Sequence, residues 1–196
     1  MTSKLRRGFK TDAERIAVAT RQELGLTVHD RLDCYTLADH LGIPILSLGE
    51  LYRDGAALVS IGALMEDEAK FSALTVCAGT RRLIIYNPAE HPGRHANSLA
   101  HELSHILLEH PPAPALEGGC RRWAGLYEEE ADWLAGALLV PRDGAMVFAA
   151  RGDTLQDGAR HFGVSVTLYR WRVNVTGVQR QVNAAASRPP SRRYGG

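Results

Sequence analysis

The sequence has few cysteines and no cysteine pair. Its 196 residues include three, Cys34, Cys77 and Cys120, and none belongs to a CxxC motif. Such an odd, widely spaced set excludes a disulfide-stapled scaffold and a cysteine zinc site, because both need paired or clustered thiols. The cysteine content therefore fits a reducing compartment.

Long apolar runs are absent as well. A membrane-spanning helix needs about 18 or more consecutive apolar residues, whereas the longest runs here, around residues 57–65 and 134–140, are short and contain glycine or serine. The first ten residues, MTSKLRRGFK, are basic but lack the apolar stretch of a secretion signal. We therefore expect a soluble, cytoplasmic protein that makes no use of a membrane.

Acidic residues are missing from the end of the chain. The whole chain carries 23 basic and 22 acidic residues, a net charge of +1, but the last acid is Asp157. Seven arginines follow that position, so the part up to Asp157 has a net charge of −6. A basic end suits phosphate groups or an acidic partner. With 45% hydrophobic residues the chain is too apolar to be disordered, and its length suits one globular domain with a small appendage.

The order of hydrophobic patterns predicts a mixed α+β fold. Apolar residues at helical spacing, with glycine or proline as stops, indicate helices over 11–24, 35–41, 97–110, 122–140, 154–162 and 165–173. Short apolar segments indicate strands over 43–48, 57–65, 71–77 and 81–86, the last two forming a hairpin. The residues from 184 onward read as a frayed tail.

The motif that carries chemistry is HELSH, residues 101–105, an HExxH pattern. Residues four apart on a helix are separated by only about 40° around its axis, so His101 and His105 can bind one metal ion. Glu102 lies beside them and suits the base that takes a proton from water. The alternative is a pair of surface histidines on an amphipathic helix.

A zinc hydrolase needs a third protein ligand and an open fourth position. The segment YEEEADWLAGALLVP, residues 127–141, offers three consecutive glutamates. Helical periodicity places Glu128 on the stripe of small and apolar residues, where a carboxylate is costly unless it is paired or binds metal. Asp132, one turn later, is positioned to accept the N–H of a ligand histidine. Glu129 and Glu130 are expected to face outward.

HELSH followed by EEEADWLAGALLVP, residues 128–141, resembles the ImmA/IrrE family of bacterial and phage metallopeptidases. The resemblance extends to the segments LRRGFKTDAERIA, LGIPI, RRLIIYNP and HFGVS. It covers roughly residues 5–182 and implies a compact, zincin-like α+β core with a small twisted antiparallel sheet beside the HExxH helix. The pattern of the later residues themselves predicts a C-terminal helical, HTH-like appendage. We expect a metallopeptidase domain over 5–150, a helical extension packed on it over 151–182, and a flexible basic tail over 183–196.

Matched residue by residue, the resemblance implies His101, His105 and Glu128 as Zn²⁺ ligands and Glu102 as the catalytic acid/base. Mn²⁺ is an alternative activating metal. Family members cleave a transcriptional repressor with a helix-turn-helix domain after stress or DNA damage. The implied function is therefore that of a zinc-dependent endopeptidase, with a small helix-turn-helix repressor as substrate, in stress or mobile-element regulation. The family pattern usually has glycine where this chain has Ser104.

Other residues are candidates for roles around this site. Tyr127, at the start of the ligand helix, and His161 are candidates for stabilising the charge that develops in the transition state. An exposed edge of the predicted hairpin could pair with an extended substrate backbone.

The basic end supports a second hypothesis. Residues 154–173 have the outline of a helix-turn-helix whose second helix carries Arg170 and Arg172, which suits phosphate groups or an acidic partner. The alternative function is therefore a DNA-binding regulatory protein in which the metal site is structural or silent. Cys120 is the candidate that would silence the metal as a fourth ligand. An intact Glu102 argues against this, because structural sites are normally closed by four protein ligands.

Overall fold

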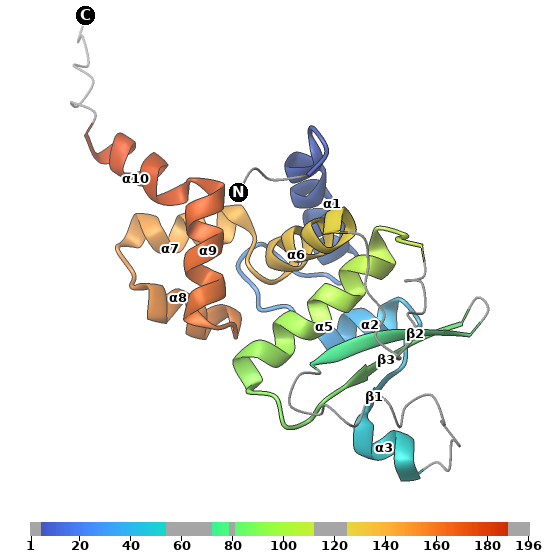
Figure 1. Ribbon diagram of the computed structural model, residues 1–196. Coiled ribbons are helices and arrows are strands. Elements are labelled where there is room, and N and C mark those ends of the chain that lie inside the picture. The colour runs from blue at the N-terminus through green and yellow to red at the C-terminus, as the bar shows by residue number, and fades with distance from the viewer. Residues whose placement is uncertain (1–4, 54–71, 79–80, 112–124, 188–196) are drawn as a thin grey trace, which may run out of the picture.

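The fold is mixed α+β, mostly helical, with one small sheet (Figure 1). The structure is a computed structural model that describes residues 5–53, 72–78, 81–111 and 125–187. Its elements, in chain order, are α1 Phe9–Glu23, α2 Cys34–His40, β1 Ile45–Ser47, α3 Leu48–Arg53, β2 Ala73–Ala78, β3 Arg81–Tyr86, α5 Pro92–Leu107, α6 Gly125–Leu139, α7 Arg142–Arg151, α8 Leu155–Phe162, α9 Val166–Thr176 and α10 Val178–Ala186.

The described sheet has three strands in the order β1-β3-β2. β2 and β3 form the predicted antiparallel hairpin, in which Thr75 is opposite Ile84. β1, however, runs parallel to β3, so the expectation of a purely antiparallel sheet is wrong. A tight turn forces neighbouring strands to be antiparallel, whereas the long connection from β1 to β3 leaves the direction free. The predicted strand over 57–65 lies outside the described residues.

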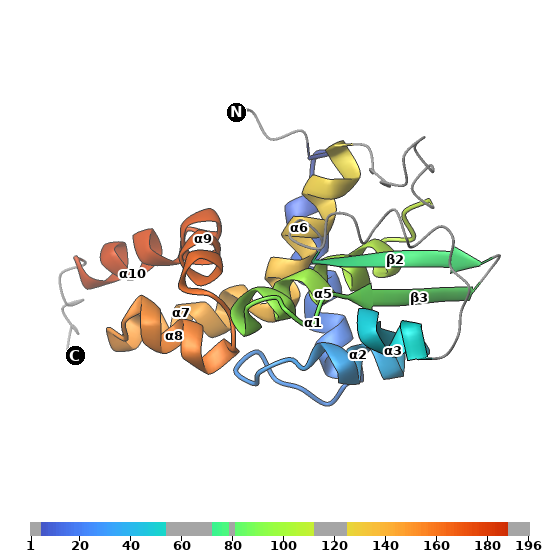
Figure 2. The same ribbon diagram turned by 60° about the horizontal axis from the view of Figure 1, so that its bottom comes forward.

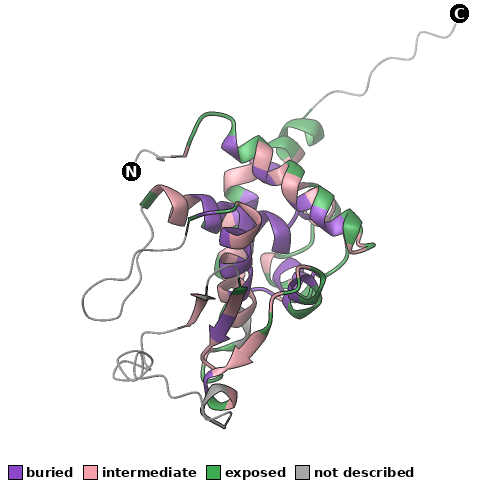
Figure 3. Ribbon diagram, turned by 90° about the vertical axis from the view of Figure 1, so that its right-hand side faces the viewer, coloured by how far each residue is buried: buried purple, intermediate pink, exposed green. Residues whose placement is uncertain are grey.

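α5 lies at the centre, with the sheet on one side and α6 on the other (Figures 1 and 2). Its buried Leu99 and Leu103 join the core, which includes Leu134 and Leu138 of α6. α1 packs on α6 as well, through small residues such as Ala13 that let the helices approach closely. Figure 3 shows the buried segments gathered in the middle and exposed ones on the outer helices.

α5 begins earlier than the sequence indicates. The helix starts at Pro92, in a segment expected to be a loop because of its proline and glycine. Proline is tolerated in the first helical turn, where its missing N–H has no intrahelical acceptor. The helix therefore gains residues 92–96, which places Arg94 on it.

The C-terminal helices α7 to α10 gather at one end of the molecule (Figures 1 and 2). α8 and α9 confirm the two helices predicted over 154–162 and 165–173, with Thr154 and Ser165 as their N-caps. α7 follows Pro141, which the sequence suggested as a stop, and proline is also suited to precede a new helix. α10 continues to Ala186, so the first residues of the predicted tail are helical. A helix-turn-helix appendage is not confirmed.

Among the described residues, no single helix is both long and apolar enough to cross a membrane. Taken together, α6 and α7 reach the length and apolar composition of a membrane span, but they are bent by 53° at the break between them.

Candidate metal centre

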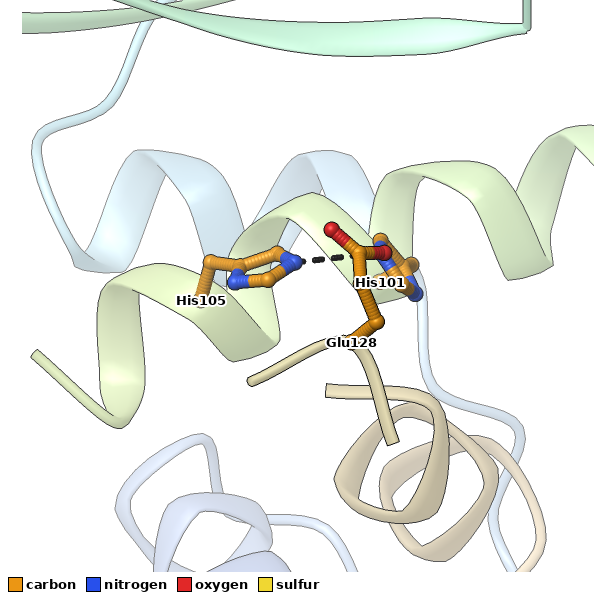
Figure 4. A group of neighbouring side chains, drawn as sticks. All are labelled: His101, His105 and Glu128. Atoms are coloured by element: carbon orange, nitrogen blue, oxygen red, sulfur yellow. Dashed lines mark hydrogen bonds and ion pairs between the residues drawn. The ribbon is translucent and has the colours of Figure 1, made fainter. Parts of the chain in front are cut away.

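Three side chains converge on one point between α5 and α6 (Figure 4). His101 and His105 come from the same face of α5, and Glu128 comes from the first turn of α6. The Nε2 atom of His101 lies 3.1 Å from Nε2 of His105 and 3.2 Å from Oε2 of Glu128. Potential ligand atoms of all three lie within 4.8 Å of one another.

These separations fit a metal ion. Two atoms bound to one tetrahedral zinc ion at about 2.0–2.1 Å lie about 3.3 Å apart, close to the separations of 3.1 and 3.2 Å between the facing atoms. Two imidazole nitrogens and one carboxylate also match the donor set of zinc hydrolases, which leaves a fourth position for water or substrate. The predicted ligands are therefore brought together in an arrangement that can hold a metal ion.

Asp132 fixes the orientation of His101. Its carboxylate lies 2.8 Å from Nδ1 of His101. Glu128 faces the other nitrogen of the same ring, and Asp132 lies one helical turn after Glu128 on α6, so both carboxylates reach His101. A proton on Nδ1, donated to Asp132, leaves the lone pair of Nε2 directed at the cluster. The periodicity of the sequence correctly placed Asp132 next to a candidate ligand.

A second chain of contacts supports His105, and the sequence did not predict it. Nδ1 of His105 lies 2.8 Å from Nδ1 of His110, whose Nε2 lies 3.3 Å from Glu130. The other Glu130 oxygen lies 3.3 Å from Nε of Arg6, near the N-terminus. If Nε2 of His105 faces a metal ion, Nδ1–H of His105 donates to His110, and His110 then donates Nε2–H to Glu130.

Glu130 is therefore not on an outward face, as the periodicity of α6 suggested. Its side chain is only 8% exposed, because α1 and α5 both pack on α6 and leave it no solvated side at this point. His110 reaches the site because the chain reverses after α5, with Glu109 in the left-handed region at φ 53°. The sequence did contain two signals for this chain of contacts. They are a histidine a few residues after the HExxH helix and an acidic residue on the ligand helix.

The carboxylates and the burial of the cluster set its charge. Burial alone would lower the pKa of His101, but hydrogen bonds to Asp132 and Glu128 raise that pKa to about 10. Burial, followed by the charges of His101 and His110, lowers the pKa of His105 to about 2. These pKa shifts favour the imidazolium form of His101, with a proton on each ring nitrogen, and the neutral form of His105 at neutral pH. A metal ion on Nε2 of His101 would displace the proton from that nitrogen and leave the one on Nδ1 with Asp132.

Glu102 is buried beside the cluster and is held by the sheet. Oγ1 of Thr75, on β2, donates a hydrogen bond of 2.7 Å to Oε2 of Glu102. Burial raises the pKa of Glu102, and the hydrogen bond from Thr75 partly offsets that increase. Thr75 was not predicted, because its approach to Glu102 depends on how the hairpin packs on α5.

The remaining candidates fall in different places. Tyr127 lies near the cluster, with its ring centroid 4.6 Å from that of His110. His161 does not join them: its Nε2 lies 2.6 Å from the carbonyl oxygen of His29, and its ring packs on Phe148. These contacts give no support to the predicted role of His161 at the transition state, because they place its ring against the C-terminal group of helices and the loop before α2. Cys120 lies outside the described residues.

The two arginines of α9 also differ. Arg170 is exposed, as a contact with nucleic acid or an acidic partner requires. Arg172 is fully buried, and its guanidinium binds the carbonyl of Val140 at 3.1 Å and Glu14 at 2.6 Å. The expectation that Arg172 contacts an external partner is wrong, because this side chain joins α9 to α1 and to the end of α6.

Comparison with known proteins agrees with the geometry. The model of the family described as IrrE N-terminal-like domain (Peptidase_M78) matches residues 58–174, more than half of the chain, including HELSH and Glu128. No curated protein matches the chain. The chain belongs to the IrrE N-terminal-like family of peptidases.

Proposed function

We propose that the protein is a zinc-dependent endopeptidase that cleaves a partner protein. The observation that carries this proposal is the spacing of the facing atoms of His101, His105 and Glu128, with Glu102 buried next to them. Zn²⁺ is the ion that this donor set favours, and Mn²⁺ is an alternative activating ion. Membership of a peptidase family supports the same class of reaction.

In this proposal His101, His105 and Glu128 hold the ion. When bound, such an ion would supply Lewis-acid chemistry at the scissile carbonyl and at the attacking water. Glu102 takes the proton from the attacking water and passes it to the leaving amine. Burial favours proton uptake by Glu102, while Thr75 keeps the carboxylate in place.

The sheet offers a way to hold the substrate. β2 is at one edge of the three-stranded order, so its outer side has no strand neighbour among the residues that the structure describes. Thr75 of β2 touches Glu102, and this edge therefore passes the reacting groups. An extended substrate segment adding to the edge would place a peptide bond near Glu102.

The proposed substrate is a small helix-turn-helix transcriptional repressor, and the proposed context is stress or mobile-element regulation. This part comes from the resemblance to the ImmA/IrrE family. A repressor encoded beside the gene for this protein is the first candidate to test. Arg170 keeps DNA binding as an alternative function, although the burial of Arg172 removes one of its two predicted contacts.

The test combines metal analysis with cleavage. The unmodified protein should bind about one zinc ion per chain, and His105→Ala or Glu128→Ala should lose it. Incubation with the neighbouring repressor and zinc or manganese should yield two fragments. A protein that cleaves equally well after exhaustive chelation, or binds no zinc at all, would overturn the proposal.

A further inference from the structure

A cavity of about 610 Å³ opens beside the metal cluster, between α5 and α9. Asp132, the hydrogen-bond partner of His101, is part of its wall. Figures 1 and 2 both show the N-terminal end of α5 running toward α8 and α9. The cavity is thus shared by the metal-site helix and α9, and it reaches the metal cluster through Asp132.

The cavity follows the face of α5 that carries the metal ligands. Asn97 lines it and lies four residues before His101, so the two share one helix face. Arg94 also lines the cavity and lies seven residues before His101, which corresponds to about 10 Å along the helix axis. A chain bound at the cluster can therefore continue along this face toward Arg94.

The opposite wall is fixed by interactions inside the fold. Thr167 and Trp171 of α9 line the cavity. Arg172, next to Trp171, ties α9 to Glu14 through its buried guanidinium. Gly136 of α6 lets Trp171 approach, since a Cβ at that position would lie 2.5 Å from the indole ring. The wall that α9 contributes is accordingly held by contacts inside the fold.

The lining suits a polypeptide. Asn97 offers an amide and Thr167 a hydroxyl group to a peptide backbone, and Trp171 offers an apolar surface. The hydroxyl of Ser98 donates to Glu90 and to the carbonyl of Arg94, so it can only accept a hydrogen bond from a ligand. The basic side chain of the lining is Arg94, which is 76% exposed and whose ion pair with Glu90 is long, at 3.8 Å. Asp132 is at the end near the metal cluster, so an acidic group is favoured only toward the Arg94 end.

We infer that this cavity binds the substrate segment on one side of the scissile bond and selects an acidic side chain that faces Arg94. The inference rests on the proposed peptidase function. An extended chain rises about 3.3 Å per residue, so the acidic side chain should lie about three residues from the cleaved bond. A cavity of this size takes a few residues of a single chain rather than duplex DNA.

The test uses two pools of fluorescein-labelled ten-residue peptides that are identical in design, except that one pool contains Asp and Glu where the other contains Lys and Arg. Binding is measured by anisotropy on the zinc-loaded Glu102→Gln protein, which leaves the peptides uncut. The acidic pool should bind about fivefold more tightly, the effect of one exposed ion pair. Arg94→Glu should reverse this order. Arg151→Glu, which changes the net charge equally at an exposed position of α7 outside the lining, should leave it unchanged.

Equal binding of the two pools, no binding of either, or the same effect from Arg94→Glu and Arg151→Glu would overturn the inference. Cleavage of the same pools by the zinc-loaded protein with Glu102 intact is mapped separately by mass spectrometry. Binding that depends on Arg94, without any cleavage, would refute the peptidase function and leave the peptide site in place. Cleavage without an acidic preference about three residues from the cut would refute the site alone.

Discussion

Replacing His110 by alanine tests whether the contacts behind His105 support metal binding. In the folded protein Nδ1 of His105 lies 2.8 Å from His110, and both imidazoles are buried. The substitution removes the partner of Nδ1 of His105 and takes from Glu130 its contact with Nε2 of His110 at 3.3 Å. Glu130 then keeps Arg6 as its described cationic partner, at 3.3 Å.

The size of the effect follows from these contacts. Leaving a buried donor without its acceptor costs about 1–3 kcal/mol. Removing a group that orients a metal-binding histidine typically lowers metal affinity by about 10–100-fold, or about 1.4–2.7 kcal/mol. We expect the zinc dissociation constant of His110→Ala to rise within that range, since His105 loses the contact that directs Nε2 at the ion.

The assay is a competition titration with a chromophoric zinc chelator at fixed pH, on protein shown to be folded by circular dichroism. His40→Ala is the matched control: Nε2 of His40 makes an exposed contact of 3.3 Å with Glu23, and such exposed contacts contribute little. A folded His110→Ala protein that binds zinc within twofold of the unmodified affinity would refute the support role. An equal loss of affinity in His40→Ala would do so as well.

Three further predictions concern other parts of the site and its frame. Thr75→Val should lower kcat by about 10–150-fold, which corresponds to the loss of one hydrogen bond to a charged group. It should also raise the pKa of Glu102 and so move the acid limb of the pH–rate profile to higher pH. Thr75→Ser should restore both properties. Arg172→Ala should cost about 3–5 kcal/mol in urea unfolding because it breaks a buried ion pair, and Arg170→Ala should change stability by about 0.5 kcal/mol or less. Because the pKa of His101 is raised to about 10, zinc binding near pH 7.5 should release about one proton and become stronger as the pH rises. Calorimetry in buffers of different ionisation enthalpy measures the number of protons released. Asp132→Asn lowers that pKa and should release less, so an equal release from both proteins would contradict this assignment.

Local spacing predicted the parts of the site that lie within one helix or one helical turn. HELSH needs only helical periodicity to bring His101 and His105 together. The same periodicity distinguished Glu128 from Glu129 and put Asp132 one turn further along. These relations hold on any regular helix, whatever surrounds it, and the structure reproduces them.

Helical periodicity cannot predict contacts between segments that are distant in the sequence. Glu130 is buried because α1 packs on the side of α6 that periodicity left to solvent. Thr75 reaches Glu102 through the packing of β2 on α5. Arg172 is buried where α9 packs on α6 and α7, with its guanidinium bound to Glu14 of α1. The basic composition of the C-terminal end described its net charge correctly but not which arginine faces outward. The parallel pairing of β1 depended likewise on a long connection without a turn signal.

The central claim is that His101, His105 and Glu128 hold a metal ion at which Glu102 acts as the base. Its most direct test compares the unmodified and Glu102→Gln proteins in one experiment, measuring zinc per chain by elemental mass spectrometry and peptide-bond hydrolysis of the same peptide pools. We predict one zinc ion per chain in both proteins and hydrolysis by the unmodified protein only. Hydrolysis that survives unchanged in Glu102→Gln, or a fully zinc-loaded unmodified protein that hydrolyses nothing, would contradict the claim.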